Sequence, residues 1–168
     1  MGNRATVIFT DGKKEIGSAV YLHWNGGAES IYAFLNEMER RHIRADQEYE
    51  TARFIHIVGE FFDQENLTGL SLGVVNGPKA INEKELAKVR TDHSDNGFYI
   101  INRTGDKPVM RRFVQHYEHT DGEYKEPTLE EMTEQQVEDE RRKAEKSDSI
   151  KNIAEYYLTA TKGKKVGN

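Results

Sequence analysis

The sequence predicts an α+β fold: an antiparallel sheet of two hairpins, two helices packed on one face of that sheet, and a helical extension at the C-terminus. Three observations predict this class. Segments of alternating apolar residues lie near both ends of the first 119 residues, segments with helical apolar spacing lie between them, and a long acidic segment follows.

The first hairpin is predicted for residues 4–24. In "RATVIFTD", Val7 and Phe9 fall on one face and Ile8 on the other, and "SAVYLHW" alternates again. Asp11-Gly12 supplies the turn residues between the two strands. The period of two therefore predicts a pair of antiparallel strands.

Two helices are predicted next. Residues 28–43 carry Ile31, Phe34, Leu35 and Met38 at helical spacing. Residues 46–62 carry so broad an apolar face that we expect this helix to be buried on more than one side.

Less regular segments follow the second helix. Residues 70–75 are ambiguous between a strand and a buried extended loop, and residues 81–89 fit a short exposed helix. A second hairpin is predicted from "FYIIN", the turn "GDKP" and "VMRRFVQHY", with Pro108 acceptable on an edge strand.

The predicted domain organisation has three parts: residues 1–119 as an α+β core domain, residues 120–148 as an acidic, mostly polar helical segment, and residues 149–168 as an amphipathic helix with a loose basic tail. A capping box of Thr128 with Glu131 predicts where the polar helix begins. Ile150, Ile153 and Tyr157 form an apolar stripe in the last segment, which predicts docking on the core or a homodimer through this helix.

Composition restricts the cellular setting and the chemistry. The chain has 168 residues, no cysteine and 36% hydrophobic residues. Disulfides and thiolate metal sites are therefore excluded, and no apolar run reaches the roughly 18 residues that a membrane span needs. We expect a cytoplasmic protein with no membrane association, no metal site and no cofactor.

The charge distribution points to one acidic segment. Residues 118–148 carry a net charge of −7, whereas residues 1–117 carry −1 and residues 149–168 carry +3. Such rows of carboxylates attract basic surfaces and can occupy a groove meant for nucleic acid. The predicted partner-binding residues are Glu130, Glu131, Glu134, Glu138, Asp139 and Glu140. A solvated helix face is the simpler interpretation of the same run.

A second candidate site is the stretch "HWNGG". His23, Trp24, Asn25, Gly26 and Gly27 lead from a strand into a helix start, where exposed backbone N–H groups and the helix dipole favour an anion. A nucleotide-binding or phosphate-binding domain, or an enzyme using His23, is therefore an alternative function. A structural turn explains the same residues and is the favoured interpretation.

A third candidate site is Arg111 and Arg112, which lie among aromatic residues on a predicted strand. Arginine alternating with Phe and Tyr can hold phosphates and stack on bases, so a single-stranded nucleic-acid binder is another alternative. The absence of net positive charge argues against it. No pair of carboxylates and no serine in a nucleophile context stands out, so a non-enzymatic role is favoured and catalysis is left open.

The string "YLHWNGG", together with "YETARFIHIVGEFF" and "LSLGV", resembles a family of small uncharacterised proteins carried by phages, prophages and plasmids. The resemblance covers roughly residues 3–75. It implies a mobile-element accessory protein in a bacterial host cell, and it assigns no functional residue. Combined with the acidic segment, it suggests a factor that binds a host protein or protein–nucleic-acid complex and inhibits or modulates it, an anti-CRISPR or similar counter-defence protein being the concrete example.

Overall fold

The computed structural model describes residues 2–89, 93–118 and 121–160. Its strands are β1 (Ala5–Phe9), β2 (Ile16–Leu22), β3 (Leu70–Asn76), β4 (Phe98–Asn102), β5 (Val109–His116) and β6 (Thr128–Glu131). Its helices are α1 (Ala28–Arg40), α2 (Gln47–Gln64), the 3-10 turn η1 (Pro78–Ala80), α3 (Glu83–Leu86), α4 (Glu134–Glu145) and α5 (Asp148–Ala160). Every helix in these ranges is too short or too polar to cross a lipid bilayer.

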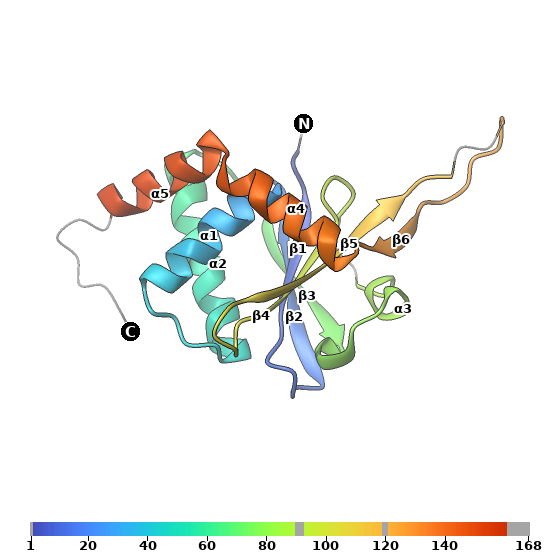
Figure 1. The fold of residues 1–168 in the computed structure, drawn as a ribbon, viewed down its shortest axis with the longest axis horizontal. Helices are drawn as coiled ribbons and strands as arrows, with labels where there is room; N and C mark the ends of the chain where they lie inside the picture. Colours follow the sequence, from blue (N-terminus) through green and yellow to red (C-terminus); the bar gives the residue numbers. More distant parts are fainter. Residues whose placement is uncertain (1, 90–92, 119–120, 161–168) are drawn as a thin grey trace.

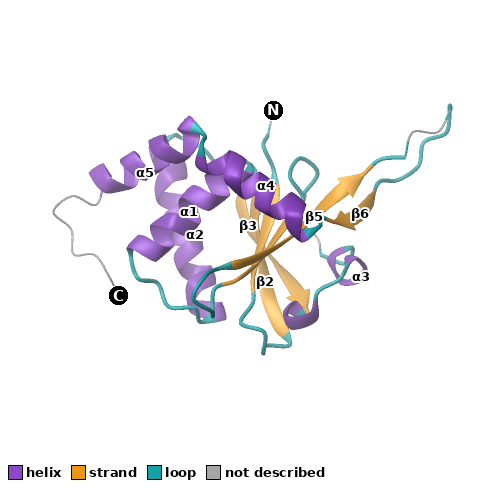
Figure 2. Ribbon diagram, viewed as in Figure 1, coloured by secondary structure: helices purple, strands orange, loops and turns teal. Residues whose placement is uncertain are grey.

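The six strands form one mixed sheet in the order β3-β2-β1-β4-β5-β6 (Figure 2). The α+β class is confirmed, and both predicted hairpins are present as β1–β2 and β4–β5. The prediction of a purely antiparallel sheet of two hairpins is wrong, because β4 pairs with β1 in parallel and β3 and β6 extend the two edges. Alternation predicts strands, but the order of strands depends on long-range packing that a local pattern does not contain.

Helices α1 and α2 cover one face of the sheet, as predicted (Figure 1). Val7 and Phe9 of β1 face this core together with Phe34 of α1 and Phe54 of α2, and all four are inaccessible to solvent. The Phe9 and Phe54 rings meet edge to face with centroids 5.2 Å apart. Burial of large aromatic side chains of this kind is the main stabilising contribution to the fold.

A second, smaller core lies on the opposite face of the sheet. Ile8 of β1 and Phe113 of β5 are buried there against Leu86 of α3. Both faces of β1 are therefore covered. This explains why every residue of the strand is buried and why all of them except Thr6 are apolar.

The acidic segment does not form one helix. Thr128–Glu131 form strand β6 beside β5, so the predicted capping box of Thr128 with Glu131 is wrong. The capping box lies five residues later, where the Thr133 side chain accepts from the Gln136 backbone and Gln136 reaches back to the Thr133 N–H. Both sites satisfy the same local pattern, and pairing with β5 selects the second.

Helices α4 and α5 both pack on α1 (Figure 1). The stripe predicted for the last helix faces the core: Ile150, Ile153 and Tyr157 are buried, and the Tyr157 hydroxyl donates to the Ile57 carbonyl of α2. The predicted segment boundaries at 119 and 148 stay predictions.

Candidate functional site

The "HWNGG" stretch is a close-packed connection from β2 to α1. Asn25 has a φ of 56°, and its side-chain amide donates to the Ser30 hydroxyl at 3.2 Å. Gly26 is needed for space, because a Cβ there would lie 2.6 Å from the Asn3 carbonyl oxygen. The Gly26 carbonyl accepts from the buried Tyr99 hydroxyl at 2.7 Å. The Asn25 side chain and the Gly26 backbone therefore both serve the packing of the turn.

An acidic residue of the chain itself, Glu29, lies in the first turn of α1. Gly27 is the N-cap residue, and a Cβ on it would lie 2.6 Å from Oε1 of Glu29. The negative charge of Glu29 interacts favourably with the positive end of the helix dipole and repels an anionic ligand. Close backbone packing thus accounts for Gly26, whereas at Gly27 a Cβ would meet only the end of the Glu29 side chain.

His23 and Trp24 take part in the same packing. Nδ1 of His23 and the Tyr21 hydroxyl are 2.6 Å apart, and the His23 and Trp24 rings meet edge to face at 4.8 Å. Trp24 is partly buried against the main core. A Cβ on Gly69 would lie 2.5 Å from Cβ of His23, so the backbone of the residue before β3 closes one side of the imidazole.

The six predicted acidic residues divide into two groups. Glu131, Glu134 and Glu138 line a groove, described below, whereas Glu130, Asp139 and Glu140 do not. Glu130 is 65% exposed and lies 3.3 Å from His116 across the β5–β6 pair. Asp139 accepts a hydrogen bond from Gln135 one helical turn earlier.

Several of these carboxylates are paired with arginines of the same chain. Glu131 binds Arg111 through two hydrogen bonds of 2.7 and 2.8 Å, which lower the pKa of the Glu131 carboxyl. Hydrogen bonds from Arg141 lower the pKa of Glu138 to about 2. Part of the negative charge predicted for a partner is therefore neutralised within the chain.

Glu140 has a structural partner that the sequence did not indicate. Arg112 is only 2% exposed, donates to Glu140 at 2.7 Å and to the Phe98 carbonyl at 2.8 Å, and stacks on Tyr99. This arrangement attaches α4 to the sheet. Because the guanidinium is enclosed in this way, Arg112 does not present a surface to nucleic acid.

Arg111 lies on the opposite face of β5 from Arg112, since successive strand residues alternate. Its guanidinium binds Glu131 and the Ile81 carbonyl. The sheet thus separates the two arginines that were predicted to bind a single strand, and both are engaged by groups of the same chain.

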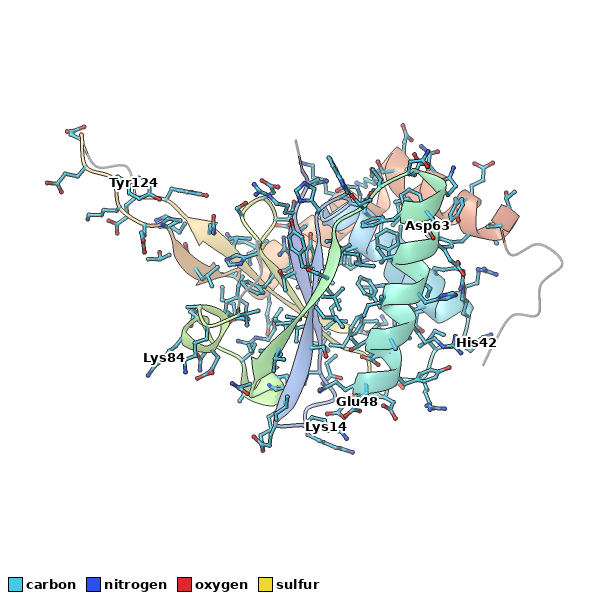
Figure 3. All side chains as sticks on the ribbon, turned by 180° about the vertical axis from the view of Figure 1, so that it is seen from behind. Lys14, His42, Glu48, Asp63, Lys84 and Tyr124 are labelled. Carbon is cyan, nitrogen blue, oxygen red and sulfur yellow. The ribbon has the colours of Figure 1, made fainter. Side chains whose placement is uncertain are left out.

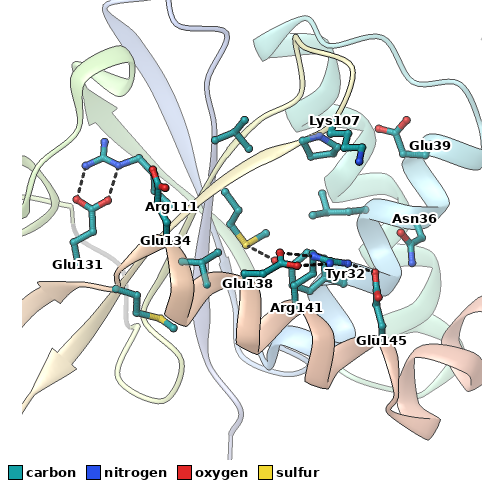
Figure 4. A pocket seen from close by; sticks show the side chains of 16 residues that line it. Tyr32, Asn36, Glu39, Lys107, Arg111, Glu131, Glu134, Glu138, Arg141 and Glu145 are labelled. Atoms are coloured by element: carbon teal, nitrogen blue, oxygen red, sulfur yellow. Dashed lines mark hydrogen bonds and ion pairs between the residues drawn. The ribbon is translucent and has the colours of Figure 1, made fainter.

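A groove of about 800 Å³ runs between α1, the β4–β5 turn with the start of β5, and α4 (Figure 4). Its apolar lining is Tyr32, Leu35, Pro108, Val109, Met110, Met132 and Val137. Its charged lining is Glu39, Glu131, Glu134, Glu138 and Glu145 against Lys107, Arg111 and Arg141. The lining thus combines apolar contact surface with two more acids than bases.

The groove exists because β6 is short. β6 pairs only with residues Phe113–His116 of β5, and the chain then turns away into α4 at Thr133. Within the described residues, Val109–Met110 at the start of β5 therefore have no paired strand on this side. Burial inside the groove raises the pKa of the Tyr32 hydroxyl to about 12, and that hydroxyl donates to the Met110 sulfur.

Buried charged groups also connect the helices. Arg103, at the end of β4, binds Glu39, Glu50 and the Ile43 carbonyl, and Arg41 bridges Glu37 and Glu60. Desolvation raises the pKa of Glu50 to about 7 despite the positive charge of Arg103. Sequence reasoning missed the pairs of Arg103 with Glu39 and Glu50 and of Arg41 with Glu60, because their members lie 64, 53 and 19 residues apart along the chain.

Among the described residues, His, Asp and Glu side chains form no cluster of three or more that could hold a metal ion. Comparison of the chain with models of known protein families, with curated proteins and with solved structures finds no match.

Proposed function

We propose that this chain is an interaction protein that binds a macromolecular complex through the groove between α1, β5 and α4. The observation that carries the proposal is the make-up of that groove: an apolar floor bordered by five carboxylates and three basic groups. A partner segment that alternates Lys or Arg with apolar residues matches both features.

The ion pairs at the border of the groove do not prevent such binding. The side chains of Arg111 and Glu131, and of Arg141 and Glu138, are each exposed by about 36 to 40%. Exposed pairs of this kind contribute only about 0–1 kcal/mol. An arginine of the partner can therefore compete for the same carboxylates, and Glu134 has no basic partner within the described chain.

Of the six acidic residues predicted to bind a partner, only Glu131, Glu134 and Glu138 line the groove. The negative residues act where they border an apolar groove, rather than as one continuous row on a helix. The resemblance to mobile-element proteins suggests a bacterial host complex as the partner, with inhibition or modulation as the outcome. In a counter-defence setting, that partner would use basic segments to hold nucleic acid.

A matched pair of charge reversals tests the proposal. The tagged protein is used to capture partners from bacterial cells, and Glu134→Lys is compared with Glu130→Lys. Both variants change the charge by the same amount, but only Glu134 lines the groove. We expect Glu134→Lys to lose the captured partner and Glu130→Lys to retain it.

The other outcomes are equally informative. Equal loss in both variants would show that the general negative charge of the segment, and not the groove, attracts the partner. Retention of the partner by both variants, or the capture of no partner by the wild-type protein, would contradict the proposal.

A further inference from the structure

The free edge of the sheet at β3 carries an unusual patch of exposed apolar side chains. In the sheet that the described residues form, β3 is the first strand in the order and pairs with β2 alone. Leu72 and Val74 of β3 are 61% and 68% exposed, and Ile16 of β2 is 64% exposed. The register pairs Leu72 with Val20 and Val74 with Ser18, so all three apolar side chains lie on the same face of the sheet as α2.

This face is uncovered at the edge because α2 lies over the inner strands. Among the strands, α2 contacts mainly β2 and β1, and Figure 3 shows α2, between the labelled Glu48 and Asp63, to one side of β3. Leu70 reaches the main core, but the two apolar residues that follow it on the same face do not.

The backbone of the same residues points away from the sheet. The Gly69 carbonyl accepts from His23 and the Gly77 N–H donates to Glu15, so the odd-numbered residues between them direct their polar groups toward β2. Leu70, Leu72, Val74 and Asn76 therefore direct their N–H and C=O groups to the open edge. The pairing with β2 is continuous over all seven residues, without a bulge.

The two edges of the sheet differ in how they are protected. β6 is four residues long, contains Glu130 and Glu131 and follows Pro127, all of which are features that discourage pairing with another strand. β3, "LSLGVVN", has neither a charge nor a proline, although 32% of the chain is charged. An apolar, uncharged, regular edge of this length is a template for strand addition.

We propose that a second copy of this chain pairs with β3, edge to edge and antiparallel about a twofold axis at Gly73. With this register, Leu72 pairs with Val74 of the other copy and Leu70 pairs with Asn76. All four edge-facing residues of each strand then meet an edge-facing residue, and each pair exchanges two hydrogen bonds. If the twofold axis lay at Leu72 or at Val74 instead, only three of the four edge-facing residues would meet an edge-facing residue of the other copy.

Charge does not oppose a second copy at this place. Each copy carries a net charge of −5, so most approaches of two copies bring like charges together. The uncharged β3 edge avoids this repulsion, and the twofold axis joins Leu72 and Val74 of both copies into one apolar surface. The result is a continuous sheet across the dimer.

Light scattering at increasing protein concentration tests the dimer. We expect the mass to rise from 19.3 kDa toward twice that value. Val74→Lys should raise the dimer dissociation constant about a hundredfold or more, because it places two lysines in one interface. Val109→Lys is the control, since Val109 is 64% exposed on another strand and its replacement should leave the dimer intact.

Hydrogen exchange of single amides tests the geometry. In the dimer, the amides of Leu72 and Val74 should be protected from exchange, and in the Val74→Lys variant the amide of Leu72 should exchange rapidly. Gly73 and Val75, which face β2, should be protected in both proteins. A wild-type chain that stays monomeric at every concentration, or a dimer whose Leu72 amide exchanges rapidly, would overturn the proposal.

Discussion

The guanidinium of Arg112 lies 3.7 Å from the centre of the Tyr99 ring and binds the carboxylate of Glu140 at 2.7 Å. One buried cation thus joins three elements: β5, β4 and the acidic helix α4. Because α4 forms one wall of the proposed binding groove, this contact also sets the position of that wall.

Removing Glu140 should destabilise the protein, because Arg112 would keep a buried charge without its partner. We expect Glu140→Ala to lower the free energy of unfolding by about 2–3 kcal/mol, somewhat below the range for fully buried pairs since Glu140 is partly exposed. Urea unfolding measures the change. Asp139→Ala, which removes an exposed carboxylate from the same helix, should cost less than about 1 kcal/mol. Equal effects of the two variants would contradict this assignment.

The buried carboxyl of Glu50 should make stability depend on pH. Its pKa is raised from 4.5 to about 7 by burial, with Asp11 and Asp46 adding to the rise and Arg103 opposing it. Between these two values the folded state binds a proton that the unfolded state has lost, so this group's contribution to stability falls as pH rises from about 4.5 to about 7.

Glu50→Gln isolates that contribution. We expect the variant to be more stable than the wild-type protein at pH 8 and the difference to vanish near pH 4, where both side chains are neutral. Thermal unfolding across this pH range measures the difference. Glu48→Gln, an exposed position on the first turn of α2, should show no such trend. A constant difference between wild type and Glu50→Gln at all pH values would rule out the raised pKa.

The two glycines Gly26 and Gly59 should respond in opposite directions to alanine. A Cβ on Gly26 would lie 2.6 Å from the Asn3 carbonyl oxygen and 2.7 Å from Cβ of Ala5, so the connection must shift. We expect Gly26→Ala to cost about 2 kcal/mol. Gly59 lies within α2 with open space around it, so Gly59→Ala should stabilise by about 0.5–1 kcal/mol. Differential scanning calorimetry of both variants tests the pair, and a neutral Gly26→Ala would contradict the close-packed description of the turn.

The Tyr157 hydroxyl should contribute measurably to the attachment of α5. It donates to the Ile57 carbonyl in the interior, and burial raises its pKa above the usual value for tyrosine. We expect Tyr157→Phe to lower the free energy of unfolding by about 1 kcal/mol. Tyr124→Phe provides the control, since Tyr124 is almost fully exposed and its variant should match the wild-type protein.

Most of the individual elements could be predicted from the sequence. The period of two in residues 5–9 and 16–22 and the helical spacing of Ile31, Phe34 and Met38 are local properties, and the structure has a strand or a helix at each of these places. The sequence predicts a capping box at the start of a helix near residue 130. The structure has one, but at Thr133 rather than at Thr128. A local pattern cannot distinguish two sites that both satisfy it.

The candidate sites, too, depend partly on local sequence features and partly on contacts between distant segments. Composition alone located the acidic segment, but it could not show that Glu131 pairs with Arg111, 20 residues away, and Glu140 with Arg112, 28 residues away. The groove depends on β6 ending at Glu131 while β5 continues to Val109, which is a relationship between two strands.

The sequence by itself determined the α+β class, the two hairpins, the two helices on one face and the location of the negative charge, because each follows from periodicity or composition over a few residues. Only the tertiary structure decided the parallel pairing of β1 with β4, the pairing of buried arginines with distant glutamates, and the exposure of Leu72 and Val74 at an open edge. These features arise from contacts between segments far apart in the chain, where burial and pairing energies exceed local preference.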